Sequence, residues 1–187
     1  AVFSCANYPA GFFHAYGEAV HAGAEYALHL GDYIYEYPAD GYASEAAAAL
    51  GRVTVPANEC LTLDDYRRRY AQTKMDADLQ SSHASAAWFC TWDDHEIDNN
   101  WVSALDQDGV PPEVFLLRRQ AAVQAYYEHM PLRRSAFPRG TDIQLYRAAG
   151  WGVLHLCGCV GPDVRQFAAG ARHPARGRGC RHAGVGF

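Results

Sequence analysis

The sequence has no excess of basic residues, and lysine is almost missing from it. Arginine and lysine together number 16 against 21 acidic residues, which gives a net charge of −5, and Lys74 is the sole lysine. Proteins that bind nucleic acids generally present a basic excess to the phosphate backbone, so we expect no nucleic-acid-binding module here. The shortage of lysine indicates a compositionally biased coding sequence.

Long apolar runs and several familiar motifs are also missing. No stretch approaches the roughly 18 apolar residues that a membrane span needs, so we expect no such span. The motifs GxGxxG, Walker A, GxSxG and HExxH do not occur, which argues against an unrelated nucleotide-binding α/β domain. The six cysteines are too scattered for a disulfide framework, and Cys157-x-Cys159 matches neither redox nor zinc spacing.

What the chain does have is enough apolar material for one core, because 49% of its 187 residues are hydrophobic and 13% are aromatic. Short apolar runs alternate with amphipathic stretches, and this β-α-β order implies parallel strands with a right-handed crossover. The sequence therefore predicts an α/β (α+β) fold. We expect strands near residues 1–5, 27–30, 87–92, 145–147 and 153–156, helices near 12–26, 63–74, 77–83 and 114–129, and one short helix inside an irregular excursion at 37–60.

The regular pattern ends near residue 156. Residues 151–187 contain eight of the 17 glycines, five arginines and a single acid. We therefore divide the chain into a domain at 1–156 and an atypical Arg/Gly/Ala-rich tail at 157–187. The composition of this tail fits a reading-frame change in a GC-rich gene, and a chain that begins at Ala1 within a core strand fits a fragment.

Polar side chains able to bind metals follow the first three predicted strands. They lie at Cys5 to Asn7, at Gly31 to Glu36 and at Asp93 to Glu96. The carboxyl ends of parallel strands meet at one edge of a sheet, so these three segments should lie together. Carboxylates, amides, a phenol, an imidazole and a thiol in one place suit a trivalent or borderline metal beside a hard divalent ion.

Each segment also has a simpler interpretation. Gly31-Asp32 can be an ordinary turn, and Cys5 can be a small buried hydrophobic residue. The segment Asp93–Glu96 can be a solvated loop or a helix N-terminus, where the helix dipole favours acidic side chains. The shared placement of the three segments after successive strands is what favours a metal site.

The same segments belong to longer motifs that fit one known family. These motifs are Phe3-Ser-Cys-Ala-Asn7 with Gly11-Phe-Phe, Leu28-His-Leu-Gly-Asp-Tyr-Ile-Tyr-Glu36, Thr62-Leu-Asp-Asp-Tyr-Arg-Arg-Arg-Tyr70, Thr91-Trp-Asp-Asp-His-Glu96 with Asn99-Asn-Trp101, and Arg119 through Met130-Pro131. Over residues 2–156 the chain resembles the PhoD-like alkaline phosphatase/phosphodiesterase family of the metallophosphoesterase superfamily. The resemblance implies a partial metallophosphoesterase-like β-sandwich flanked by helices, with a metal site at the strand ends.

The resemblance also implies roles for individual residues. Asp32 corresponds to the carboxylate that bridges two metals, while Cys5 and Tyr35 correspond to the thiolate and phenolate ligands of a ferric ion, Fe3+. Asp94 is expected near the second metal, which is calcium, Ca2+, in this family. His95 follows that position and is expected to stabilise the transition state or to protonate the leaving oxygen. Asp94 and His95 are therefore the predicted catalytic residues.

The function implied is alkaline phosphatase-type hydrolysis of phosphate mono- or diesters, with the substrate polarised between two cations. The family's later histidine-containing metal motifs have no counterpart in this chain, so the alternative is a non-catalytic, truncated fragment that binds metal. Family members are commonly exported, so we expect a secreted or periplasmic protein, although the chain carries no signal peptide. Neither the oligomeric state nor a preference for mono- or diesters follows from the sequence.

Three further features of the sequence support less specific predictions. Asn99 and Asn100 are secondary candidates for the site, and the sequence does not choose between them. The arginines at 67–69 are expected to form a solvated helix face rather than to steer an anion. The stretch Asp106-x-Asp108-Gly lacks the remaining EF-hand positions, so we expect a turn there.

Overall fold

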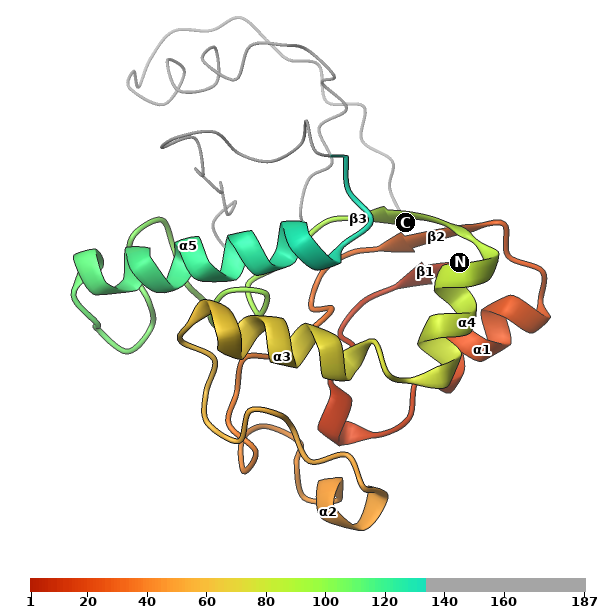
Figure 1. Cartoon of the computed structure of the whole chain (residues 1–187), viewed down its shortest axis with the longest axis horizontal. Helices are drawn as coiled ribbons and strands as arrows, with labels where there is room; N and C mark the ends of the chain where they lie inside the picture. Colours follow the sequence, from red (N-terminus) through yellow and green to blue (C-terminus); the bar gives the residue numbers. More distant parts are fainter. Residues whose placement is uncertain (134–187) are drawn as a thin grey trace, which may run out of the picture. The chain divides into compact units, whose positions relative to one another are not determined.

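The part of the chain that the structure describes, residues 1–133 of a computed structural model, is built on a three-stranded parallel sheet (Figure 1). The strands are β1 (Val2–Phe3), β2 (Tyr26–His29) and β3 (Ala87–Cys90), and they pair in the order β1-β2-β3. All pairs are parallel, as the β-α-β pattern predicts, with Leu28 opposite both Val2 and Phe89. The strands predicted at 145–147 and 153–156, and the tail at 157–187, lie outside the described residues.

The helices follow the predicted order, with differences at their ends. They are α1 (His14–His21), α2 (Ala47–Leu50), α3 (Leu63–Thr73), α4 (Ala77–Ser85) and α5 (Pro112–His129), with a 3-10 turn η1 (Tyr8–Ala10) before α1. The helix predicted over 12–26 is wrong at both ends. Phe13 has non-helical backbone angles, and Gly23 adopts a positive φ of 72° that ends the helical path. No helix among residues 1–133 is long and apolar enough to cross a membrane.

Local sequence signals explain where two segments begin or turn. The Thr62 hydroxyl accepts from the Asp65 amide at 3.3 Å, and the Asp65 carboxylate accepts from the Thr62 amide at 2.9 Å, which is the capping box that starts α3. The Asp106 carboxylate accepts from the amides of Gly109 and Val110, both at 2.8 Å. This confirms the predicted turn at 106–109.

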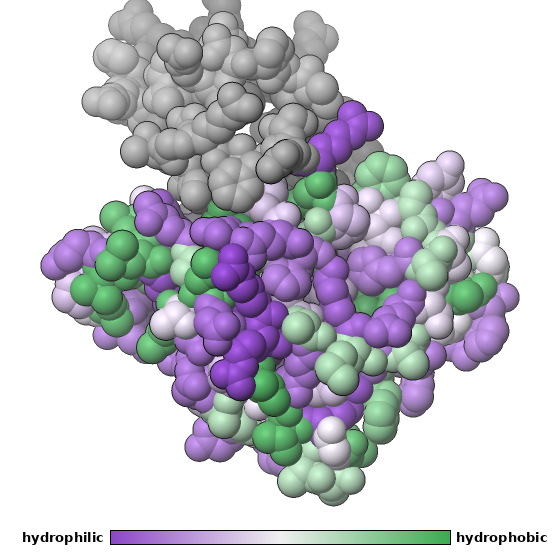
Figure 2. All heavy atoms as spheres, in the orientation of Figure 1, coloured by the Kyte–Doolittle hydropathy of each residue, from purple (hydrophilic) through white to green (hydrophobic). Residues whose placement is uncertain are grey.

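One arginine of α3 contradicts the prediction of a solvated face at 67–69. Arg67 and Arg68 are exposed, and Arg67 pairs with Glu128 of α5 at 2.6 Å. The surface on this side of the molecule is largely hydrophilic (Figure 2). Arg69 is only 1% exposed, because it lies on the same face of the helix as Tyr66 and Tyr70. Its guanidinium donates to backbone carbonyls, those of Tyr35, Val55, Pro56 and Asn58.

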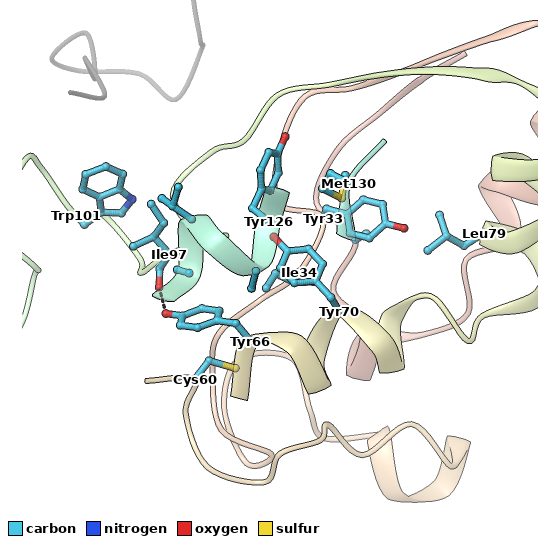
Figure 3. Packing of buried hydrophobic residues seen from close by; sticks show 14 of the residues in the cluster. Tyr33, Ile34, Cys60, Tyr66, Tyr70, Leu79, Ile97, Trp101, Tyr126 and Met130 are labelled. Carbon is cyan, nitrogen blue, oxygen red and sulfur yellow. Dashed lines mark hydrogen bonds between the residues drawn. The ribbon is translucent and has the colours of Figure 1, made fainter. Parts of the chain in front are cut away.

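The core lies between the sheet and the helices and is rich in tyrosine (Figure 3). Tyr66 and Tyr70 come from α3 and Tyr126 from α5, and all three are buried. The Tyr66 hydroxyl donates to the carbonyl of Ile97 at 2.5 Å, so this phenol joins α3 to the loop that follows β3. Among residues 1–133 the hydroxyls of Tyr70 and Tyr126 have no hydrogen-bond partner, so these two rings contribute to the core through packing.

The two faces of the sheet differ in their surroundings. Helices α1, α3 and α4 lie on one side of it (Figure 1), and the side chains of β2 that point there, Ala27 and His29, are buried. On the other face Val2, Tyr26 and Phe89 are 64%, 61% and 58% exposed. Parallel sheets are normally covered on both faces. The described residues form one sheet layer with helices, and the second layer of the predicted sandwich stays a prediction.

A buried histidine beneath the sheet should make stability depend on pH. His29 Nδ1 accepts from the Gly31 amide at 3.3 Å, and its Nε2 lies 3.0 Å from the Tyr16 hydroxyl. Burial and the neighbouring His83 lower the pKa of His29 from 6.5 to about 4. The unfolded chain therefore binds a proton between pH 6.5 and 4 that the folded chain does not bind, so stability falls as the pH falls through this window.

Urea unfolding measured at pH 7 and at pH 4 tests this dependence. His29 alone should account for a loss of up to about 3 kcal/mol between the two conditions. His29→Gln should reduce the pH dependence by the share of His29 and leave that of His83, whose pKa burial also lowers to about 4, whereas His21→Gln, on the exposed surface of α1, should leave it as in the wild type. An equal slope in wild type and His29→Gln would contradict the assignment.

Candidate metal centre

The loops that follow β2 and β3 touch at the edge of the sheet. Gly31 has a φ of 108°, and a Cβ placed on it would lie 2.3 Å from the backbone nitrogen of Asp93. Asp32 follows with a φ of 55°, in the left-handed region that side chains other than those of Gly, Asn and Asp rarely adopt. This close approach places the first acid of one loop beside the acids of the other.

Asp32, Asp94 and His95 form a compact group of ligand atoms. One atom from each lies within 4.8 Å of the other two, close enough to share one cation. Asp32 Oδ1 is buried and has no hydrogen-bond partner within residues 1–133. Burial raises the pKa of Asp32, with Asp94 adding to the effect, while His95 and the hydrogen bonds from Cys5 and Tyr35 oppose it. A buried oxygen of this kind lacks the positive partner that a cation supplies.

Cys5 and Tyr35 also reach Asp32. The Cys5 thiol donates to Asp32 Oδ2 at 3.5 Å, and the Tyr35 hydroxyl donates to the same oxygen at 3.2 Å. Cys5 is exposed and has a φ of 59°, so the interpretation of it as a small buried hydrophobic residue is wrong. Burial raises the pKa of the Tyr35 phenol, and the charge of Asp32 adds to this effect.

The imidazole of His95 is held by two side chains from the other loop. Its Nδ1 lies 2.8 Å from Glu36 Oε2, and its ring centroid lies 4.2 Å from that of Tyr35. Burial alone would lower the pKa of His95, but the bond to Glu36 and the charges of Asp32 and Asp94 outweigh it and raise the pKa to about 9. A proton on both ring nitrogens at neutral pH leaves Nε2–H available as a donor.

The two secondary candidates contact the group through their backbones. The Asn99 amide donates to Glu36 Oε1 at 2.8 Å, and the Asn100 amide donates to Asp94 Oδ2 at 2.6 Å. The Asn99 side chain donates to Gln107 Oε1 at 2.7 Å. These contacts bring Asn100 closer to the acidic group through its main chain, and they do not assign a role to either amide side chain.

Two buried glutamates were missed by sequence reasoning. Glu36 and Glu96 are both 0% exposed, and each hydrogen-bonds groups on the loop that the other one comes from. Burial raises the pKa of Glu96, while the backbone amides of Tyr33, Asp93 and Asp32 oppose the shift because all three donate to its carboxylate. Glu36 is the last residue of the segment Gly31–Glu36, and Glu96 is the last residue of Asp93–Glu96. The sequence signal for a buried role was the position of each acid directly beside residues expected to be buried.

Fold and site together define an α/β protein whose functional residues gather beyond the carboxyl ends of parallel strands. Comparison with known proteins identifies the family within this structural class. Residues 1–174 match the PhoD-like phosphatase family. The chain is 46% identical over 168 residues to alkaline phosphatase D of Bacillus subtilis (strain 168), covering 89% of this chain and 28% of that protein. The chain belongs to the PhoD-like phosphatase family.

A solved structure agrees with the sequence comparison. The structure described as that of PhoD matches with a TM-score of 0.70 at 46% identity, over 79% of this chain and 28% of that one. The chain thus spans little more than a quarter of the length of each relative. The family match runs past residue 156, where the sequence pattern led us to divide the chain, and that division stays a prediction.

Proposed function

We propose that the chain takes part in the hydrolysis of phosphate mono- or diesters at a site for two cations. The observation that carries the proposal is the buried, unpartnered Oδ1 of Asp32 beside Asp94 and His95. A carboxylate in this setting is stabilised by a cation, and cations in turn attract the phosphate of an ester. Membership of a phosphatase family supports the same substrate class.

The residues present fit the two ions that the resemblance implies. The carboxylate of Asp32, the phenol of Tyr35 and the thiol of Cys5 would hold Fe3+, since carboxylate and phenolate are hard anionic oxygen donors that suit it and a thiolate also binds iron. Asp94 would hold Ca2+, with Asp32 shared between the ions, because calcium prefers carboxylate oxygens. When bound, the two ions polarise the phosphoryl oxygens and lower the pKa of water.

The remaining steps belong to His95 and the groups that orient it. Glu36 keeps a proton on Nδ1, so Nε2–H faces away from Glu36 and can donate to a phosphoryl oxygen or to the leaving oxygen. The Tyr35 ring against the imidazole restricts its rotation. His95 thus neutralises charge that develops on the ester oxygen, with its Nδ1 held by Glu36.

Phosphate release from nitrophenyl phosphate and bis(nitrophenyl) phosphate tests the proposal. The purified chain, loaded with Fe3+ and Ca2+ at alkaline pH, should release nitrophenol. His95→Gln should lower kcat by about 100-fold, as removal of a general acid does. Asp40→Asn, an exposed position outside the site, should retain wild-type activity.

The second candidate function is a metal-binding fragment without activity. The chain spans 28% of each relative, and the same assay decides between the two functions. Binding of both ions without release of nitrophenol would support this alternative, while failure to bind either ion would overturn both. Secretion or periplasmic location, expected from the family, is part of the proposal for the whole protein.

A further inference from the structure

Within residues 1–133 the carboxylate of Glu96 accepts from three backbone amides, and they come from both loops of the site. Its Oε2 accepts from the Asp32 amide at 3.0 Å and from the Asp93 amide at 2.8 Å. Its Oε1 accepts from the Tyr33 amide at 2.7 Å. Glu96 itself lies after β3, whereas Asp32 and Tyr33 lie after β2, so one buried side chain joins the two loops.

The backbone that Glu96 binds needs such support. Asp32 has a φ of 55°, a conformation that costs a non-glycine residue about 1 kcal/mol and persists only where neighbouring groups hold it. The direction of the Asp32 side chain follows from this backbone conformation. Because the amides of Asp32 and Tyr33 both donate to Glu96, the turn cannot rotate without losing two charge-assisted hydrogen bonds.

Glu96 is not placed as a ligand. Both of its oxygens already accept amide protons, it is 0% exposed, and it lies outside the group that Asp32, Asp94 and His95 form. We propose that Glu96 is a positioning residue, which fixes the left-handed turn at Asp32 and thereby aims the Asp32 carboxylate at Asp94 and His95. The inference rests on the proposed function only in taking Asp32 and Asp94 to bind a cation.

Glu96→Gln distinguishes the hydrogen-bonding role of Glu96 from the mere filling of space by its side chain. Glutamine has nearly the same shape but offers one acceptor oxygen and one amide group that donates. Whichever way the side chain is turned, at least one of the three backbone amides then faces a donor instead of an acceptor. Glu96→Asp keeps the charge and both oxygens but is one methylene shorter, so it tests whether charge alone is sufficient.

Two measurements on the full 187-residue chain test the proposal. Amide hydrogen exchange followed by NMR reports whether Asp32, Tyr33 and Asp93 lose protection in Glu96→Gln. Titration calorimetry with Ca2+ alone reports affinity, which should fall by about 10- to 100-fold, as for other changes behind a metal ligand. Thr62→Ala, which removes comparable hydrogen bonds at the remote cap of α3, is the control for lowered stability.

The expected result is loss of protection at the three amides and lower affinity in both Glu96 variants, with unchanged affinity in Thr62→Ala at similar thermal stability. Wild-type affinity in Glu96→Asp would show that charge suffices and would overturn the positioning role. Unchanged protection in a folded Glu96→Gln would overturn it as well. If the wild type binds no Ca2+, the proposed function fails, and the exchange data alone then decide whether Glu96 holds the turn.

Discussion

Gly31→Ala is expected to destabilise the fold by at least about 3 kcal/mol and to separate the two loops of the metal centre. The added Cβ would lie 2.3 Å from the nitrogen of Asp93 and 2.7 Å from the carbonyl carbon of Trp92. Both are backbone atoms, which cannot move aside as the end of a flexible side chain can. The φ of 108° at Gly31 adds strain, because residues with a Cβ rarely adopt it.

Urea unfolding with a matched glycine measures this effect. Gly23 also has a positive φ, 72°, but a Cβ there would meet no atom of the described residues within 4 Å. Gly23→Ala therefore carries only the backbone cost, about 1 kcal/mol. Similar losses in the two variants would mean that the loops after β2 and β3 do not approach as closely as described. Loss of Ca2+ binding in Gly31→Ala alone would show that the same contact forms the site.

Asp32→Asn should remove cation binding without unfolding the protein. Changes behind a metal ligand already cost about 10- to 100-fold in affinity, so loss of the charged ligand itself should cost at least about 100-fold. Burial raises the pKa of Asp32, which means that the fold without a metal disfavours the charge. Asparagine removes that charge, and its oxygen can still accept from Cys5 and Tyr35, so the metal-free variant should be at least as stable as the wild type.

Asp32→Asn is expected to lower the affinity for Ca2+ while leaving the thermal stability equal or higher, so two measurements test the prediction. Titration calorimetry with Ca2+ should show the loss of affinity, and thermal unfolding without metal should show an equal or higher Tm. Asp40→Asn, on an exposed loop, should change neither quantity. A variant that unfolds at lower temperature and binds Ca2+ normally would assign Asp32 a structural role in place of a ligand role.

The strand-end residues could be predicted because parallel topology is a strong constraint. Once residues 1–5, 27–30 and 87–92 are taken as parallel strands, Cys5, Asp32 and Asp94 must lie at one edge, and the structure brings them together. The capping box of α3 was equally accessible, since Thr62 and Asp65 satisfy each other locally.

The interior of the site could not be predicted in the same way. Glu36 and Glu96 look like ordinary loop acids, and their function depends on amides about sixty positions away in the sequence. The helix expected from residue 12 begins only at His14, because Phe13 has non-helical backbone angles. For Arg69, the charge of the side chain led to a prediction of solvent exposure. Its position on the helix, beside Tyr66 and Tyr70, instead places it in the core.

Arg69 also determines where this protein can tolerate change. Its guanidinium binds carbonyl oxygens at Val55, Pro56 and Asn58, which every amino acid possesses, and it does not depend on the side chains of those positions. Side chains of α3 therefore hold residues 55–58, since Gln72 Oε1 also accepts from the Val55 amide at 2.7 Å. In evolutionary terms, the exposed positions Val55 and Asn58 can drift while Arg69 cannot, and a lysine in its place would lack the planar fork of donors that several carbonyls share.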